Sequence, residues 1–184
     1  MDKQKLKTIL NKLEKTTDSL GMKIDKKIIK AVAIFNYLGF TTTQSCQGHL
    51  NYGYISPWIQ FGPKQNKTSL TTQKKIIDLN KKAHNNKNYI KIGLLEKKII
   101  NSFKKDLHRL TDLLNSFYET RDAAFDQRLI LVDLKTRVQL IAQGAQFQEL
   151  FSKKEKKEKI ALYRKEFSEF MHFISEQLVH KTDC

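Results

Sequence analysis

The chain has 184 residues, of which 40% are hydrophobic and 10% aromatic, enough for a compact core and an argument against a disordered chain. Its net charge is +15, and it has no run of about 18 apolar residues, so we expect no membrane span. It has two cysteines and no apolar N-terminal stretch of the signal-peptide kind, so we expect a cytoplasmic protein without a disulfide framework.

In the first half of the chain, apolar spacing and turn residues predict three helices and two strands. Asp25 stands before the second helix and is expected to cap it, and Gly39 is expected to end it. A Thr-rich stretch and a segment that begins near Pro57 have the composition of strands. The helices are expected at about 2–16, 26–38 and 69–83, and the strands at 40–45 and 55–61.

The second half of the chain has longer amphipathic patterns. Regular apolar spacing predicts a long helix over about 94–120 and another over about 154–179, with a shorter helix at 145–152. Two apolar, β-branched segments at 128–134 and 137–142 predict a β-hairpin, although its turn lacks Gly and Asn. A short strand is expected at 89–92.

Strands at both ends of the chain are expected to share one sheet. The predicted fold class is therefore α+β, with a small, mostly antiparallel sheet packed by long amphipathic helices. We expect residues 1–184 to form a single domain, with the long helices at about 94–120 and 154–179.

The most distinctive segment is Thr41-Thr-Thr-Gln-Ser-Cys-Gln-Gly-His49, which places Cys46 three residues before His49. One hypothesis is a metal site, but structural zinc normally has four ligands, and no second pair of this spacing exists, so no metal is predicted. A second hypothesis is thiol chemistry, because a histidine beside a cysteine can hold it as the thiolate. Cys46 and His49 are therefore the candidate catalytic residues, unless Cys46 is simply a small buried side chain.

The hypothesis that this segment favours is a ligand-binding loop. Gly48 permits a positive φ, so the amides of residues 46–49 can converge on an anion or a polar ligand head. The only tryptophan could stack on a nucleic-acid base, or it could pack the sheet against a helix. The candidate ligand-binding residues are Gln44, Ser45, Gln47, Gly48 and Trp58.

The positive charge is unevenly distributed along the chain. Residues 1–95 carry a net +12 without any arginine, whereas residues 96–184 carry +3. Clustered cations gain affinity for phosphates by releasing counterions, which favours RNA or another phosphate-rich ligand as the partner. The alternative is a compositional bias, because 29 of the 34 basic residues are lysine, and arginine is the better reader of base edges.

One stretch resembles a known family. Ile24-Asp25-x-x-Ile28, then Asn36, then Phe40-Thr-Thr-Thr-x-Ser45-Cys46-x-Gly48 is similar to the early part of the wybutosine-synthesis tRNA methyltransferase family, and Trp58-x-x-Phe61 would be its next strand. The resemblance, confined to residues 24–61, implies an α+β tRNA-modifying enzyme that uses S-adenosylmethionine, with the Ser-Cys-x-Gly turn at its site. The family has serine and arginine where this chain has Gln47 and His49. The segment also looks like an uncharacterised bacterial group with a Thr-x-Ser-Cys-Glu-Gly-His motif, which implies no activity.

Two functions follow as hypotheses. The first is a basic cytoplasmic protein that binds RNA or a nucleotide-like ligand at the turn of residues 44–49, as a tRNA-modifying enzyme if the resemblance holds. The second is a non-catalytic interaction protein, in which the helices at 94–120 and 154–179 form an antiparallel pair that binds a partner or self-associates.

Overall fold

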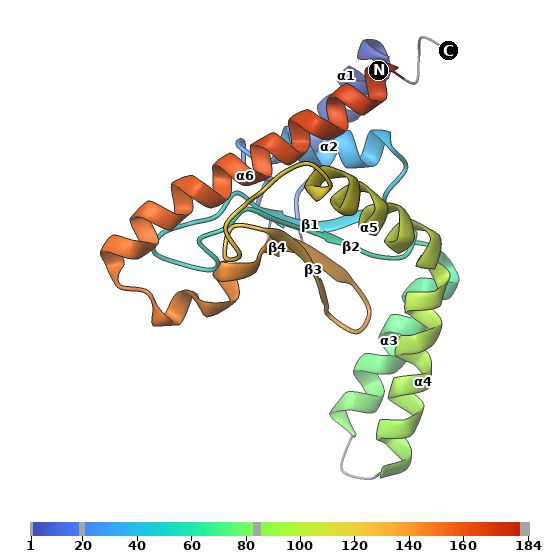
Figure 1. Ribbon diagram of the computed structural model, residues 1–184. Helices are drawn as coiled ribbons and strands as arrows, with labels where there is room; N and C mark the ends of the chain where they lie inside the picture. Colours follow the sequence, from blue (N-terminus) through green and yellow to red (C-terminus); the bar gives the residue numbers. More distant parts are fainter. Residues whose placement is uncertain (1, 19–20, 83–85, 181–184) are drawn as a thin grey trace.

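The structure, a computed structural model, describes residues 2–18, 21–82 and 86–180, and its centre is one antiparallel sheet (Figure 1). The strand order is β1-β2-β4-β3, so the two inner strands come from distant parts of the chain. This pairing confirms the α+β fold class. The strands are β1 (Thr42–Cys46), β2 (Trp58–Phe61), β3 (Leu129–Asp133) and β4 (Val138–Ala142).

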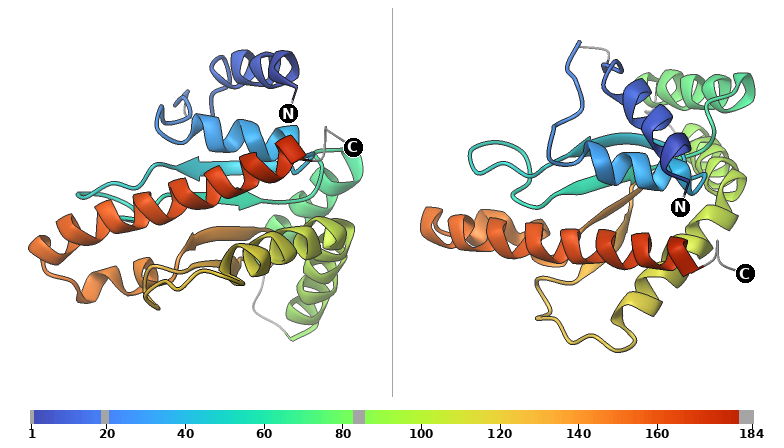
Figure 2. Two further views of the ribbon diagram at one scale, coloured as in Figure 1. Left: turned by 45° about the horizontal axis from the view of Figure 1, so that its top comes forward. Right: turned by 90° about the horizontal axis from the view of Figure 1, so that it is seen from above.

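Helices α2, α5 and α6 lie over one face of this sheet, and α1 packs on α2 (Figures 1 and 2). The helices of the described chain are α1 (Lys3–Leu13), α2 (Ile29–Tyr37), α3 (Lys67–Lys81), α4 (Asn86–Ser102), α5 (Lys104–Tyr118) and α6 (Lys153–His180), with a 3₁₀ helix η1 (Gln143–Leu150) before the last. None of the described helices is long and apolar enough to cross a membrane.

The main core lies between the sheet and these helices. Side chains alternate between the two faces of a strand, so Ile59 and Phe61 of β2 point to the same face and are almost fully buried. The ring of Phe61 packs edge-on against Phe35 of α2, with 4.9 Å between centroids, and Phe35 also contacts Phe170 of α6 at 6.5 Å. This packing fixes α2 and α6 above the strands that carry the Cys46–His49 segment.

The expected helix at 94–120 is two helices, and this prediction was wrong. Phe103 has φ −128° and ψ 22°, outside the helical region, and its carbonyl oxygen accepts the amides of Asp106 and Leu107 at the start of α5. The chain bends there because α4 packs on α3, whereas α5 packs on β3 and α6. The expected strand at 89–92 lies inside α4, since a short apolar run does not distinguish a strand from a helix.

Helices α3 and α4 form a hairpin that projects away from the sheet (Figures 1 and 2). It has a small core of its own, separate from the core under α2, α5 and α6. The buried residues of this second core are Ile76, Ile92, Ile99 and Phe103.

Two smaller predictions have clear outcomes. The β3–β4 hairpin is confirmed, although its turn lacks Gly and Asn. Lys135 adopts φ +66° there, and its amide donates to the carboxylate of Asp133 at 2.7 Å. The helix expected at 145–152 is the 3₁₀ helix η1, which spans Gln143–Leu150.

Candidate functional site

The Cys46–His49 segment forms a tight turn at the end of β1. Gly48 has φ +78°, and a Cβ atom there would lie 2.6 Å from the carbonyl oxygen of Ile55 and 2.8 Å from the carbonyl carbon of Ser56. Both the backbone conformation and the close approach therefore require glycine. The turn is pressed directly against the chain that leads into β2.

Two side chains from the C-terminal third of the molecule hold the loop between β1 and β2. Arg164 of α6 donates to the carbonyl oxygens of Gln47 at 3.3 Å and Gly48 at 2.7 Å. Gln148 of η1 donates to the carbonyl oxygen of Gly53 at 2.9 Å and accepts the amide of Ile55 at 2.8 Å. The loop is thus fixed at both ends by hydrogen bonds between these side chains and its backbone.

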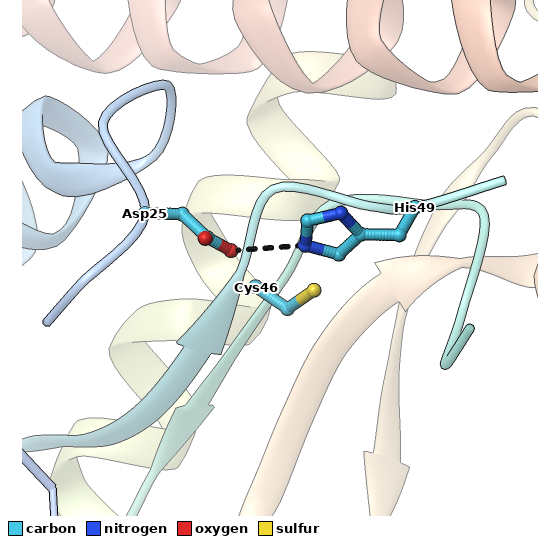
Figure 3. Close-up of side chains that lie close together, drawn as sticks. All are labelled: Asp25, Cys46 and His49. Atoms are coloured by element: carbon cyan, nitrogen blue, oxygen red, sulfur yellow. Dashed lines mark hydrogen bonds and ion pairs between the residues drawn. The ribbon is translucent and has the colours of Figure 1, made fainter. Parts of the chain in front are cut away.

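Asp25 joins Cys46 and His49 in one cluster (Figure 3). Asp25 Oδ2 lies 3.3 Å from His49 Nε2, and the Asp25 oxygen, the Cys46 sulfur and a His49 nitrogen all lie within 4.8 Å of one another. The cluster is half-buried, with 16% of the His49 side chain and 31% of the Asp25 side chain exposed. An acid, a thiol and an imidazole therefore converge from two segments of the chain.

The expected role of Asp25 as a helix cap was wrong. Helix α2 begins after Ile28 without a side-chain cap, and it is the backbone carbonyl of Asp25 that accepts the amides of Ile28 and Ile29. The carboxylate instead accepts the amide of Gln47 at 3.0 Å. The Asp25 side chain therefore binds the turn and not the N-terminus of α2.

The thiol of Cys46 is less acidic than an ordinary cysteine. Burial raises its pKa most, and the Asp25 carboxylate raises it further, while the Gly48 amide and the Arg164 guanidinium lower it. His49 Nε2 faces Asp25 and also lies 3.3 Å from the hydroxyl of Tyr52, whose ring stacks on the imidazole with 4.1 Å between centroids. The cluster as it stands therefore favours the neutral thiol over the thiolate that nucleophilic chemistry needs.

A groove of about 490 Å³ runs between α2 and α6 beside the turn. Gln47 lies at its wall, and three cationic side chains, Lys27, Lys30 and Arg164, line it. Its apolar lining consists of Ile28, Ala31, Ile34, Pro57, Phe167 and Met171. We call it the α2–α6 groove.

The candidate ligand-binding residues are divided between two places. Gln47 lines the α2–α6 groove, and Gly48 shapes the turn. Gln44, Ser45 and Trp58 instead line a separate hollow of about 520 Å³ against residues 16–18 and 22–24. The candidate catalytic residues Cys46 and His49 do lie together.

Sequence reasoning missed Asp25 and Arg164 as site residues. Asp25 lies 21 positions before Cys46, and its place at a helix start gave it a sufficient structural role. Asp25 could have been predicted as a site residue because it lies in the same stretch, residues 24–61, as the turn. Arg164 had no such signal, because only the packing of α6 over the sheet brings it to Gln47.

Most of the positive charge lies away from the turn. Residues 64–105, which include α3 and α4, carry 12 lysines and two acids, a net +10 of the chain's +15. In all views, the α3–α4 hairpin and the loop between β1 and β2 lie at opposite ends of the molecule (Figures 1 and 2). Most of the charge that accompanied the Cys46–His49 segment in sequence therefore belongs to a different surface.

No family model, curated protein or solved structure matches this chain. The resemblance of residues 24–61 to the wybutosine-synthesis methyltransferases therefore stays a prediction.

Proposed function

We propose that this is a cytoplasmic RNA-binding protein that holds the RNA backbone on the α3–α4 hairpin and one nucleotide in the α2–α6 groove. The observation that carries the proposal is the concentration of charge in residues 64–105, which have a net +10, of which +7 lies within residues 67–102 of the projecting α3–α4 hairpin. Residues 1–63 carry a net +5 and residues 106–184 have no net charge, so a uniform compositional bias does not account for this distribution.

The composition of the hairpin indicates how it would bind. Lys74, Lys75 and Lys98 are exposed, and residues 64–105 contain no arginine. Lysine is a compact, flexible cation that neutralises phosphates, whereas bidentate recognition of a base edge is the work of arginine. Contacts of this kind supply affinity and position without reading the sequence.

The α2–α6 groove supports the second half of the proposal. Its volume falls in the range of small-molecule sites, and its mixture of apolar walls and cationic groups suits a base attached to a phosphate. S-adenosylmethionine fits the same lining less well, because its sulfonium is cationic and no carboxylate is among the described residues of the groove. Gln47 and the other residues of the Cys46–His49 turn would contact the bound nucleotide, so His49→Ala should weaken binding without unfolding the protein.

The decisive experiment measures binding of a labelled, unmodified tRNA transcript by fluorescence anisotropy over a range of salt concentrations. The test variant replaces Lys74, Lys75 and Lys98 with glutamine, and the control replaces Lys153, Lys154 and Lys157 of α6. The control lysines are also exposed but lie among acids. We expect the hairpin variant to lower the slope of log K against log salt by about 2, since each lost phosphate contact removes about 0.7 to 0.9. The control should keep the wild-type slope.

An equal loss of slope in the two variants would contradict the hairpin as the binding surface. Salt-insensitive binding, or none, would contradict the proposed function. Equal binding to duplex DNA would show that the hairpin recognises phosphates in general and would contradict the choice of RNA.

One observation favours a second candidate, an interaction protein. Large apolar side chains are exposed on the same hairpin, with Ile90 67% and Leu94 65% exposed on one side of α4. Tyr89 of α4 and Leu70 and Ile77 of α3 are also more than half exposed. This candidate interaction surface lies on α3 and α4, whereas the sequence analysis expected it on a pair formed by helices 94–120 and 154–179. If it self-associates, light scattering should show a dimer that Ile90→Lys dissociates; a wild-type monomer at all accessible concentrations would contradict this candidate.

A further inference from the structure

The Asp25, Cys46 and His49 cluster has the geometry of a metal site. Tetrahedral zinc with bonds of about 2.0 to 2.3 Å places its ligand atoms about 3.3 to 3.6 Å apart. Asp25 Oδ2 and His49 Nε2 are 3.3 Å apart, which already matches one edge of such a tetrahedron. The whole set lies within 4.8 Å, so side-chain rotations alone can close it. We propose that Asp25, Cys46 and His49 bind one zinc ion, with a fourth position open to water or a substrate atom.

The ligand types select the metal. Magnesium and calcium take oxygen ligands, whereas a thiolate with an imidazole and one carboxylate suits zinc and similar borderline ions. Within the described part of the chain, no other histidine, cysteine or acid joins this cluster. Three protein ligands with an open position are typical of catalytic rather than structural zinc. The sequence expectation of no metal rested on the missing fourth ligand, and it did not include Asp25.

The surroundings hold the Asp25 carboxylate and the backbone of the turn in place before any ion arrives. The amide of Gln47 donates to Asp25 Oδ2 at 3.0 Å, a contact of the kind that orients a metal-bound carboxylate. The amide of His49 donates to the carbonyl oxygen of Tyr54 at 2.9 Å, and Arg164 holds the carbonyls on either side of the bend. The ring of Tyr52 lies over the imidazole and shields that side of the site.

This inference goes beyond the proposed RNA binding and is tested on the protein alone. The full chain, with Cys184→Ser so that Cys46 is the only thiol, is stripped with a chelator and titrated with cobalt(II). We expect one cobalt per chain, a thiolate-to-cobalt charge-transfer band in the near ultraviolet and the intense visible bands of a tetrahedral ion. Zinc should displace the cobalt and slow the reaction of Cys46 with a thiol reagent at least tenfold, and a chelator should restore it.

Variants assign the ligands. Cys46→Ser should abolish the charge-transfer band, and Asp25→Asn and His49→Gln should each weaken cobalt binding at least tenfold. His108→Gln, at an exposed position on α5, is the matched control and should bind as the parent does. The Lys74, Lys75 and Lys98 variant should also keep full metal binding, which separates this site from the hairpin.

Three results would overturn the assignment. They are a folded parent protein without a charge-transfer band, cobalt binding that survives Cys46→Ser unchanged, and a Cys46 thiol that zinc does not protect. The first and third use no variant at a ligand position, so a variant that fails to fold leaves the test intact.

Discussion

Two glycines in the loop between β1 and β2 allow the cost of a left-handed backbone conformation to be measured apart from the cost of a steric clash. Gly48 and Gly53 both have positive φ, at +78° and +63°, but a Cβ would meet backbone atoms only at Gly48. Gly53→Ala should cost about 1 kcal/mol from the left-handed conformation alone. Gly48→Ala should cost at least about 2 kcal/mol more, because the turn must move away from Ile55. Urea unfolding of the two variants measures the difference, and equal losses would show that the close approach costs nothing.

The neighbours of Cys46 change the pKa of its thiol, and the rate of its reaction with a thiol reagent measures this effect. Burial and Asp25 raise its pKa, so the metal-free protein should react slowly with a thiol reagent at neutral pH and faster as the pH rises. Asp25→Asn removes a negative charge beside the sulfur, which lowers the pKa and increases the thiolate fraction at a fixed pH. The rate constant of chelator-treated Cys184→Ser protein should therefore rise on this substitution. An unchanged or slower rate would contradict the contribution of Asp25.

At the residue scale, the sequence located half of the candidate site. The contrast between the 41–49 segment and the lysine-rich remainder pointed to Cys46, Gly48 and His49, because each has chemistry that a generic surface does not need. Asp25 and Arg164 could not be found this way. Their side chains serve the turn only through the tertiary positions of α2 and α6.

At the scale of elements, periodicity predicted where apolar faces lie but not where the backbone bends. The apolar spacing of α4 continues through Phe103 into α5 without a proline or glycine at the junction. The bend arises because the apolar face of α4 packs against α3, whereas the apolar face of α5 packs into the main core. Such a change of packing partner is not accompanied by a helix-breaking residue at the junction, so the sequence does not predict it.

The small core of the α3–α4 hairpin should open independently of the sheet. Ile99 is 3% exposed, so Ile99→Ala should cost about 2 to 5 kcal/mol within a cluster of few side chains. Hydrogen exchange should then accelerate across Lys67–Ser102, while β4 and α6 keep their protection. Ile77→Ala, on the exposed side of α3, is the control and should change neither. Uniform acceleration throughout the chain would show that the hairpin and the sheet unfold as one unit.

At the scale of the whole molecule, one buried acid ties three elements together. Glu166 of α6 is 3% exposed, accepts the hydroxyl of Tyr118 at 2.9 Å and forms an ion pair with Arg121 at 2.8 Å. The same Tyr118 hydroxyl accepts the amide of Leu129 at the start of β3 at 2.7 Å. Burial and the nearby Glu166 raise the pKa of Tyr118, which keeps the hydroxyl available as a donor.

Removing Glu166 should therefore destabilise the protein strongly. Glu166→Ala leaves Tyr118 without its acceptor and weakens the pairing of Arg121, and we expect a loss of about 3 to 5 kcal/mol in the free energy of unfolding. Glu169 also pairs with Arg121 but is one-third exposed, so Glu169→Ala should cost about 1 kcal/mol or less. Thermal and urea unfolding provide the comparison. A similar loss of unfolding free energy in both variants would mean that the burial of Glu166 does not strengthen its contribution to stability.

The pairing of β2 with β4 sets an order of events during synthesis. Asp25, Cys46 and His49 leave the ribosome early, but β2 has only one neighbour until Val138–Ala142 emerges, and the turn lacks its clamp until Arg164 follows. A nascent chain of intermediate length therefore presents Ile59 and Phe61 on an unfinished sheet edge, which is a surface that chaperones recognise. A premature stop between His49 and α6 would leave a chain that contains every proposed zinc ligand but lacks the Arg164 side chain that holds their turn.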